Sequence, residues 1–269
     1  MVMEPEKVST IASSVKEKVV ETQNGIPTFF DNLIINHSTF YLNNISKDYS
    51  TLERAITTLD LKGGERFVDL SKRVKEYPFS DLDAYSRVCS QGVLNCIKWR
   101  NKPLFKSSQD FVIYNLLIAE LRPSTIIEIG STEGSLFWLN DICLMNNIEV
   151  DIIGFDKRKL PYLDARIKTY QGDLANIESI LTKEILSEIK HPVLIIEDAH
   201  MYIGKVINYL KEFLLPNDYF IIEDSISKQN DILDSFINDT EGKFLVDTYY
   251  TDFFGINTVS SVNSILKKI

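Results

Sequence analysis

Acidic side chains recur in this sequence where short apolar runs end. The apolar runs cover residues 125–129, 150–155, 167–170, 193–196 and 219–222. The polar residues at their ends are Glu128, Asp156, Asp173, Glu197, Asp198, His200, Glu223 and Asp224. If the runs are parallel strands, their carboxyl ends meet at the edge where open α/β sheets bind ligands. Like charges gathered there destabilise a fold unless something binds them, so we expect a ligand site at this edge.

The carboxylates that follow 193–196 and 219–222 predict a site for a hard divalent cation. Asp198 lies 25 and 26 residues before Glu223 and Asp224, at the ends of two strands that we expect to be neighbours. Carboxylate oxygens without accompanying His or Cys ligands suit Mg²⁺ or Ca²⁺ better than Zn²⁺, and a cation would relieve their repulsion. Glu197 is an alternative to Asp198, because successive strand residues point to opposite faces.

His200 follows these acids directly and could act as the general base that removes a proton from a substrate hydroxyl. The alternative is a hydrogen bond to a backbone group. An iron site of the two-His, one-carboxylate type is not expected. His191 and His200 flank one predicted strand and would lie roughly 30 Å apart along a fully extended chain, and His37 is remote in sequence.

The loop Glu128-Ile-Gly130-Ser-Thr-Glu133-Gly134-Ser135 predicts a nucleotide-like ligand at the end of the first strand. Glycine lets the backbone come close to such a ligand, because it has no Cβ. The spacing differs from the G-x-G-x-x-G of nicotinamide dehydrogenases and from a P-loop. An ordinary strand–turn–helix corner is the alternative. Asp156, 26 residues after Gly130, suits two ribose hydroxyls or, alternatively, a helix N-cap.

Strands and helices alternate from about residue 106, which predicts a doubly wound, mostly parallel α/β sheet of seven strands. The expected strands are 125–129, 150–155, 167–170, 193–196, 219–222, 244–250 and 258–266, and the expected helices are 109–121, 135–146, 177–189, 203–214 and 231–238. Residues 1–105 carry few strand signals, and helical spacing at 8–21, 50–60 and 80–98 predicts a mainly helical region. We therefore divide the chain into 1–105 and a ligand-binding domain, 106–269.

The composition is that of a globular protein, with 44% hydrophobic and 25% charged residues among 269. A formal net charge of −9 argues against nucleic-acid partners. The three cysteines match no zinc spacing, and we expect them to stay reduced in a cytosol. We expect no membrane span and no signal peptide, and therefore a cytoplasmic location.

Residues 95–269 resemble the cephalosporin-hydroxylase-like proteins. These belong to the metal-dependent class I S-adenosylmethionine (SAM) O-methyltransferases, which include sugar and macrolide methyltransferases. The Glu128-x-Gly130-x-x-x-Gly134 loop is similar to motif I of class I methyltransferases. The closest match lies in Val193-Leu-Ile-Ile-Glu-Asp-Ala-His200 and Asp218-Tyr-Phe-Ile-Ile-Glu-Asp-Ser225. Further similarity lies in Trp99–Pro103, in residues 109–123, and in the tail from Phe253 through Leu266-Lys-Lys.

This resemblance implies a Rossmann-like class I methyltransferase fold, bound SAM and Mg²⁺ or another hard divalent cation. The implied SAM contacts are Glu128, Gly130, Ser131, Gly134, Ser135, Asp156, Asp173 and Glu197. The implied metal ligands are Asp198, Glu223 and Asp224, with His200 as the base. The family's usual metal-binding Asp precedes the His by three residues; Glu197 holds that place here, so it stays an alternative ligand.

The expected reaction is methyl transfer to a hydroxyl of a small molecule, natural product or glycoside. Two alternatives stay open: a non-catalytic module that binds SAM or a partner protein, and a hydroxylase-type enzyme. For residues 1–105 two roles also stay open: a cap over the acceptor pocket, or the contact between subunits of a homo-oligomer. The sequence does not identify the acceptor.

Overall fold

The computed structural model describes residues 65–236 and 243–269. The expected helical segments at 8–21 and 50–60, and His37, lie outside the described residues. The chain divides into two compact units, Met1–Glu65 and Arg66–Ile269, and the elements described below belong to the second. None of the helices in the described ranges is long and apolar enough to cross a membrane.

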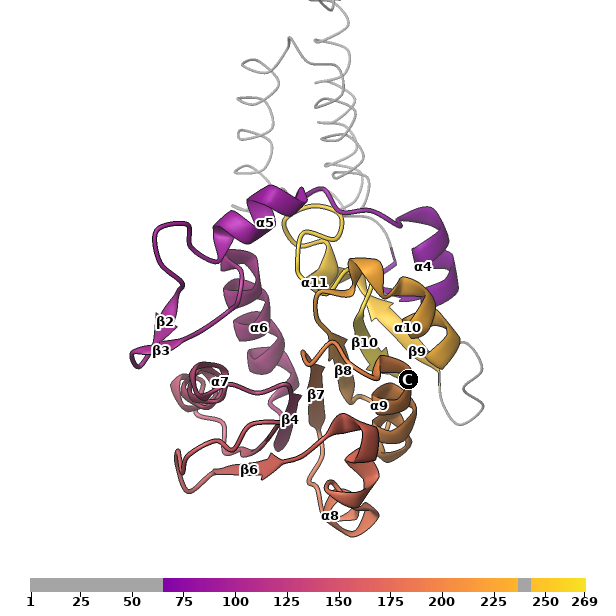
Figure 1. Ribbon diagram of the computed structural model, residues 1–269. Helices are drawn as coiled ribbons and strands as arrows, with labels where there is room; N and C mark the ends of the chain where they lie inside the picture. Colours follow the sequence, from indigo (N-terminus) through magenta and orange to yellow (C-terminus); the bar gives the residue numbers. More distant parts are fainter. Residues whose placement is uncertain (1–64, 237–242) are drawn as a thin grey trace, which may run out of the picture. The chain divides into compact units, whose positions relative to one another are not determined.

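Eight strands of the second unit form one sheet in the order β1-β9-β10-β8-β7-β4-β5-β6 (Figure 1). The strands are β1 Phe67–Asp69, β4 Thr125–Ile129, β5 Asp151–Asp156, β6 Ile167–Gln171, β7 Val193–Glu197, β8 Tyr219–Ile222, β9 Phe244–Asp247 and β10 Ile265–Lys268. Neighbours from β6 to β8 are parallel, whereas β10, β9 and β1 pair antiparallel. The mostly parallel α/β sheet is confirmed.

The sheet has eight strands rather than the expected seven, because β1 pairs with the outer edge of β9. A strand of three residues is too short to show an alternation of apolar and polar residues, so no sequence pattern marks it. Around β1, residues 66–105 also form helices α4 Leu70–Glu76 and α5 Ala84–Ser90 and the short hairpin β2 Lys98–Trp99 and β3 Lys102–Pro103. The described part of the N-terminal region is therefore not helical throughout.

The central strands are apolar apart from Thr125, Glu128 and Glu197, because helices cover both faces of the sheet. Every residue of β4, β7 and β8 is buried. Helices α6 Ser108–Leu121 and α7 Glu133–Met145 cover one face of the sheet and pack against its buried isoleucines and leucines. Along each strand these residues alternate with residues that point to the other face of the sheet. On the opposite face lie α9 Ile203–Leu210, α10 Gln229–Phe236, α4 and α8 Lys183–Ser187.

Several expected elements end earlier than the sequence pattern indicates, because polar side chains cap new turns there. The expected helix 177–189 consists of a 3₁₀ turn, η1 Leu174–Ser179, and α8, which Thr182 caps. The expected strand 244–250 ends at Asp247, whose carboxylate accepts a hydrogen bond from the Tyr249 N–H and begins α11 Thr248–Thr251. The remaining short helices are η2 Lys211–Phe213 and η3 Ser225–Ser227.

The register of the parallel strands brings their carboxyl ends level. Ile129 at the end of β4 lies opposite Phe155 of β5 and Glu197 of β7, and Glu197 lies opposite Ile222 of β8. The loops that follow these strands therefore leave the sheet at one edge, as the pattern of acidic residues predicts.

Candidate metal and cofactor site

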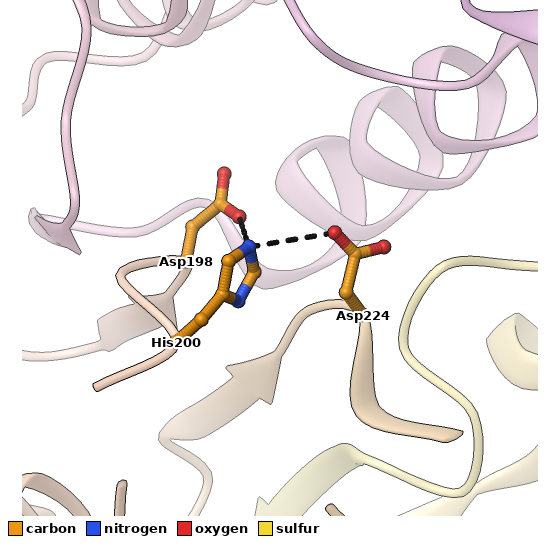
Figure 2. Close-up of side chains that lie close together, drawn as sticks. All are labelled: Asp198, His200 and Asp224. Carbon is orange, nitrogen blue, oxygen red and sulfur yellow. Dashed lines mark ion pairs between the residues drawn. The ribbon is translucent and has the colours of Figure 1, made fainter. Parts of the chain in front are cut away.

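Three polar side chains converge at the carboxyl ends of β7 and β8: Asp198, His200 and Asp224 (Figure 2). His200 Nε2 lies 3.5 Å from Asp198 Oδ1 and 3.4 Å from Asp224 Oδ2. One ligand atom from each residue lies within 4.8 Å of the others. Two carboxylates facing one centre fit a hard divalent cation, and the imidazole lies beside them.

The turns that carry this cluster have unusual backbone conformations. His200, Tyr202 and Asp224 have φ values of 61°, 53° and 44°, a region that residues other than glycine rarely adopt. Such conformations persist where surrounding contacts enforce them, and they concentrate at functional sites. In the first turn those contacts come from Glu197, whose Oε1 accepts hydrogen bonds from the N–H groups of Ala199 (3.1 Å) and His200 (3.0 Å).

Asp198, rather than Glu197, is the residue of this pair that joins the cluster. Glu197 is fully buried, and burial raises the pKa of its carboxyl. Its role in the described residues is to hold the turn after β7. The sequence left the choice between the two open, and this geometry favours Asp198 as the ligand.

Glu223 is not brought into the cluster, although it adjoins Asp224 in sequence. Its carboxylate is buried and accepts hydrogen bonds from Lys106 Nζ at 2.6 Å and from the Tyr114 hydroxyl. Burial, together with the charge of Asp198, raises the pKa of Glu223 well above its ordinary value. Of the three metal ligands implied by the resemblance, the structure thus brings two together, and the role of Glu223 stays a prediction.

Lys106 is a buried cation among these acids that the sequence analysis missed. Its Nζ donates to Asp198 Oδ2 at 2.8 Å and lies 3.9 Å from Glu128 Oε1. Burial alone would lower the pKa of Lys106, but the charges of Asp198, Glu223 and Glu128 outweigh this and raise it. One signal could have marked this residue: a lysine immediately before a helix N-terminus is unfavourable for the helix dipole, and Lys106 directly precedes the N-cap of α6, Ser107.

Lys228 is a second lysine that the sequence analysis missed, and it contacts the ring of His200. Its Nζ lies 2.6 Å from His200 Nδ1, donates to the Glu223 carbonyl at 2.8 Å and lies 3.6 Å from Glu197 Oε2. This contact orients the ring so that Nε2 faces the carboxylates. An ammonium group can only donate, so Nδ1 accepts and the ring proton of a neutral His200 lies on Nε2 in this arrangement.

His191 lies at the other end of β7, where its Nδ1 is 2.6 Å from Asp218 Oδ2. The two histidines within the described ranges therefore do not share a centre.

The loop between β4 and α7 is shaped by close packing of the protein backbone. A Cβ on Gly130, which has a φ of 88°, would lie 2.6 Å from the Ala199 nitrogen, and a Cβ on Gly134 would lie 2.1 Å from the Pro103 oxygen. Both glycines are therefore required because neighbouring segments of the protein pack against them. From the sequence we expected a different reason, the close approach of a ligand.

The two serines of this loop are also engaged within the protein. Ser131 Oγ donates to the Glu128 carbonyl at 2.6 Å and accepts from the Phe155 N–H at 2.9 Å. Ser135 Oγ donates to Glu128 Oε2 at 2.6 Å. These contacts fix the loop, so any part that the two side chains play toward a cofactor stays a prediction.

Glu128 has one carboxylate oxygen that is satisfied and one that is not. Its Oε1 is buried and has no hydrogen-bond partner among the described residues. Burial raises the pKa of Glu128 to about 7, against the opposing charge of Lys106. A buried acceptor without a partner calls for an explanation, and a donor group on a bound cofactor would supply it.

Asp156 and Asp173 lie at the ends of β5 and β6, as expected, and both have local partners. Asp156 Oδ1 accepts from the N–H of Arg158 at 2.7 Å and from its Nε at 2.9 Å. Asp173 Oδ1 accepts from the Ala175 N–H at 2.9 Å and caps η1. Asp173 thus acts as a helix cap in this structure, and a cofactor role for either residue stays a prediction.

Comparison with known proteins identifies relatives of this fold. The model of the family described as rhamnosyl O-methyltransferase/CmcI matches residues 91–249. The apo structure of CmcI-N160 is 24% identical with a TM-score of 0.53, covering 65% of this chain and 76% of that one. The CmcI-D160 structure with Mg and SAM is 26% identical with a TM-score of 0.52, covering 64% and 76%. A search of curated proteins found no match.

Proposed function

The chain belongs to the rhamnosyl O-methyltransferase/CmcI family, whose model matches more than half of it, and on this premise we propose that it methylates a hydroxyl of a small molecule, natural product or glycoside. Membership makes the chain an SAM-dependent O-methyltransferase. The related CmcI-D160 structure holds Mg and SAM, and we assign the same two cofactors to this chain. The acceptor class is the new part of the proposal.

The observation that carries this proposal is the position of the Asp198–His200–Asp224 cluster beside the glycine loop. The Asp198 N–H donates to the Ile129 carbonyl at 2.8 Å, and a Cβ on Gly130 would lie 2.7 Å from the Asp198 carbonyl carbon. The turn that carries the metal donors therefore touches the turn that begins the cofactor loop. A methyl donor over this loop and a hydroxyl held at the cluster would lie next to each other.

The residues of the cluster would bind and orient the acceptor hydroxyl. A divalent cation bound there supplies Lewis acidity that lowers the pKa of that hydroxyl. Asp198 and Asp224 would fix the position of the acceptor hydroxyl. Positioning provides most of the rate gain that we expect for methyl transfer.

His200 is the residue proposed to accept the hydroxyl proton, at Nε2. This role requires the tautomer in which Nε2 is free of hydrogen. The contact between Lys228 Nζ and Nδ1 must therefore open when His200 acts as the base.

For SAM, we propose contacts along the loop from Glu128 through Gly130, Ser131 and Gly134 to Ser135, with Asp156 on the ribose. Arg158, which now holds Asp156, is an exposed side chain, so ribose hydroxyls could displace it at little cost. Asp173 and Glu197 complete the proposed set. Glu128 Oε1, which accepts no hydrogen bond from the described residues, supports a donor from the cofactor at this position.

Calorimetric titration of the purified protein with SAM, with and without Mg²⁺, tests the cofactor assignment. A panel of hydroxyl acceptors followed by mass spectrometry then tests methyl transfer. We expect Asp198→Asn and Asp224→Asn to keep SAM affinity within about threefold while turnover falls by about 100-fold or more, because a metal that activates a hydroxyl contributes several kcal/mol.

Asp234→Asn is the matched control, since Asp234 is an exposed residue of α10, and it should turn over as the wild type does. Normal turnover of Asp198→Asn would show that the cation site is assigned wrongly. Absence of SAM binding to the wild type would overturn the cofactor assignment itself.

A further inference from the structure

We propose that Lys106 is an internal cation that competes with a divalent metal ion for Asp198 and Glu223, and so sets how tightly the enzyme holds its metal. This inference rests on the proposed cation site and adds a residue that regulates it. It also assigns a role to a buried charge that the proposed reaction does not use.

The ammonium group of Lys106 lies between two acids. Lys106 Nζ lies 2.8 Å from Asp198 Oδ2 and 2.6 Å from Glu223 Oε2, and only 2% of its side chain is exposed. It bridges a member of the cation cluster to the neighbouring acid. A metal ion that bound the same oxygens would lie about 2.0–2.6 Å from them, so the ammonium and the metal cannot both hold these oxygens closely.

Lys106 is surrounded by several acidic side chains. The ammonium of Lys106 faces Asp198, Glu223 and, at 3.9 Å, Glu128. Asp224 adds a further carboxylate on the other side of Asp198, across His200. Lys228 is a second ammonium group at this site, 3.6 Å from Glu197 Oε2. The carboxylate of Asp224 faces His200 rather than an ammonium group, so its negative charge can attract a divalent cation. Repulsion between Lys106 and that cation is strong, because charges in a buried environment are poorly screened.

The side chain of Lys106 can move while its backbone cannot. Ser107 and Asp110 form a capping box at the start of α6, and Asp110 Oδ1 accepts hydrogen bonds from the Ser260 N–H and Oγ, both at 3.1 Å. Hydrogen bonds within α6 and to the C-terminal segment therefore fix the backbone beside Lys106. The flexible four-carbon stem of lysine allows Nζ to withdraw from this anchor point.

Withdrawal of Lys106 would release an oxygen of Asp198 and an oxygen of Glu223 at the same time. Glu223 could then join Asp198 and Asp224, which is the ligand set that the resemblance implies. The observed cluster and the implied set would thus be two states of one site, and Lys106 would decide between them.

The test is the affinity of the full-length protein for Mn²⁺, measured from the electron paramagnetic resonance signal of free Mn²⁺ at fixed pH and ionic strength. We expect Lys106→Met to bind Mn²⁺ at least about tenfold more tightly than the wild type, because it removes both the competitor and its repulsion. The matched control is Lys190→Met, which removes an exposed lysine that pairs with Asp151 at the opposite end of the strands, and it should bind as the wild type does. Unchanged or weaker binding by Lys106→Met would overturn the inference.

Lys106→Met leaves the Glu223 carboxylate buried without its cation, which can prevent folding. The double variant Lys106→Met/Glu223→Gln avoids this, and its reference is Glu223→Gln alone. The double variant should again bind Mn²⁺ at least about tenfold more tightly than its reference, and equal affinities would contradict competition at Asp198.

The outcomes also separate this inference from the proposed function. Equal, measurable Mn²⁺ affinities of wild type and Lys106→Met would overturn the role of Lys106 and leave the cation site in place. Binding by Lys106→Met alone would support the role of Lys106 while showing that the wild type does not load the metal. No binding by either protein would overturn both.

Discussion

Glu128 shows how a single buried carboxyl in the cofactor loop affects the stability of the unit that contains it. Its pKa is raised from an ordinary value of 4.5 to about 7 by burial. A carboxyl with a higher pKa in the folded chain than in the unfolded chain stabilises the fold fully below about pH 4.5, and this stabilisation is lost as the pH rises through about 7. The loop that must bind a cofactor at neutral pH therefore contains a group that disfavours folding there.

We predict that Glu128→Gln removes this dependence. Between pH 4.5 and pH 8, the free energy of unfolding of the wild type should fall relative to the variant by up to about 3 kcal/mol, given about 1.4 kcal/mol for each pKa unit. Urea unfolding across this pH range measures the difference. Glu133→Gln is the control, because Glu133 is a partly exposed acid of the same loop that pairs with Lys102. If the free energies of unfolding of the wild type and Glu128→Gln changed in parallel with pH, the prediction would be refuted.

Individual site residues differ in how far the sequence could predict them. Asp198, His200 and Asp224 follow predicted strands, and the ends of parallel strands share an edge, so their meeting could be expected. Lys106 and Lys228 come from a loop before α6 and from the turn before α10, and their approach depends on tertiary packing. The separation of Glu223 from Asp224 could not be predicted either, because Asp224 adopts a left-handed conformation that turns its side chain away.

The corner between β4 and α7 depends on the close approach of the β2–β3 hairpin. A Cβ at Gly134 would lie 2.1 Å from the backbone oxygen of Pro103, and backbone atoms cannot yield as a flexible side chain can. We therefore predict that Gly134→Ala lowers the free energy of unfolding by about 1–3 kcal/mol, measured by urea unfolding.

Gly204→Ala is the matched control for that prediction. Gly204 lies in α9, where the nearest atom to a new Cβ would be Ser235 Oγ at 3.7 Å. Alanine there should be neutral or stabilise the fold by up to about 1 kcal/mol, since it reduces the freedom of the unfolded chain. Equal losses at both positions would show that the hairpin contact does not matter.

The elements in the middle of the sheet were the most predictable. The parallel strands β4, β7 and β8 are buried on both faces and so read as apolar runs in which Thr125, Glu128 and Glu197 are the exceptions. The antiparallel edge was less predictable, because local capping decides it: Asp247 ends β9 by capping α11, and β1 is only three residues long. Local hydrogen bonds of this kind compete with strand pairing and leave little trace in hydrophobic periodicity.

The C-terminal segment after α11 connects the sheet edge to α4 and to the site. Asn257 Nδ2 donates to the carbonyls of Tyr77 (3.0 Å) and Phe79 (2.9 Å), while Ser260 bonds Asp110 beside Lys106. A segment distant in sequence thus supports the backbone that positions the buried lysine. The division at residue 105, the role of the N-terminal region and the oligomeric state stay predictions.

Arg73 of α4 forms the buried ion pair that anchors this C-terminal segment. Its Nη2 donates to both oxygens of Asp252, at 2.6 and 2.7 Å, and its Nε donates to Asn263 Oδ1 at 3.0 Å. Removing one member of a buried pair leaves an uncompensated charge, so we predict that Arg73→Met costs about 3–5 kcal/mol of unfolding free energy. The exposed pair of Lys190 and Asp151 gives the contrast, and Lys190→Met should cost less than about 1 kcal/mol.

A double-mutant cycle separates loss of the charge pair from loss of packing. Because Arg73→Met/Asp252→Asn removes both charges, it should be less destabilised than the sum of the two single variants by about 1–3 kcal/mol. Urea unfolding of the four proteins measures this coupling. Additive losses would mean that Arg73 acts through its ring contact with Tyr77 and its bond to Asn263, so that packing rather than charge joins α4 to the segment behind the metal site.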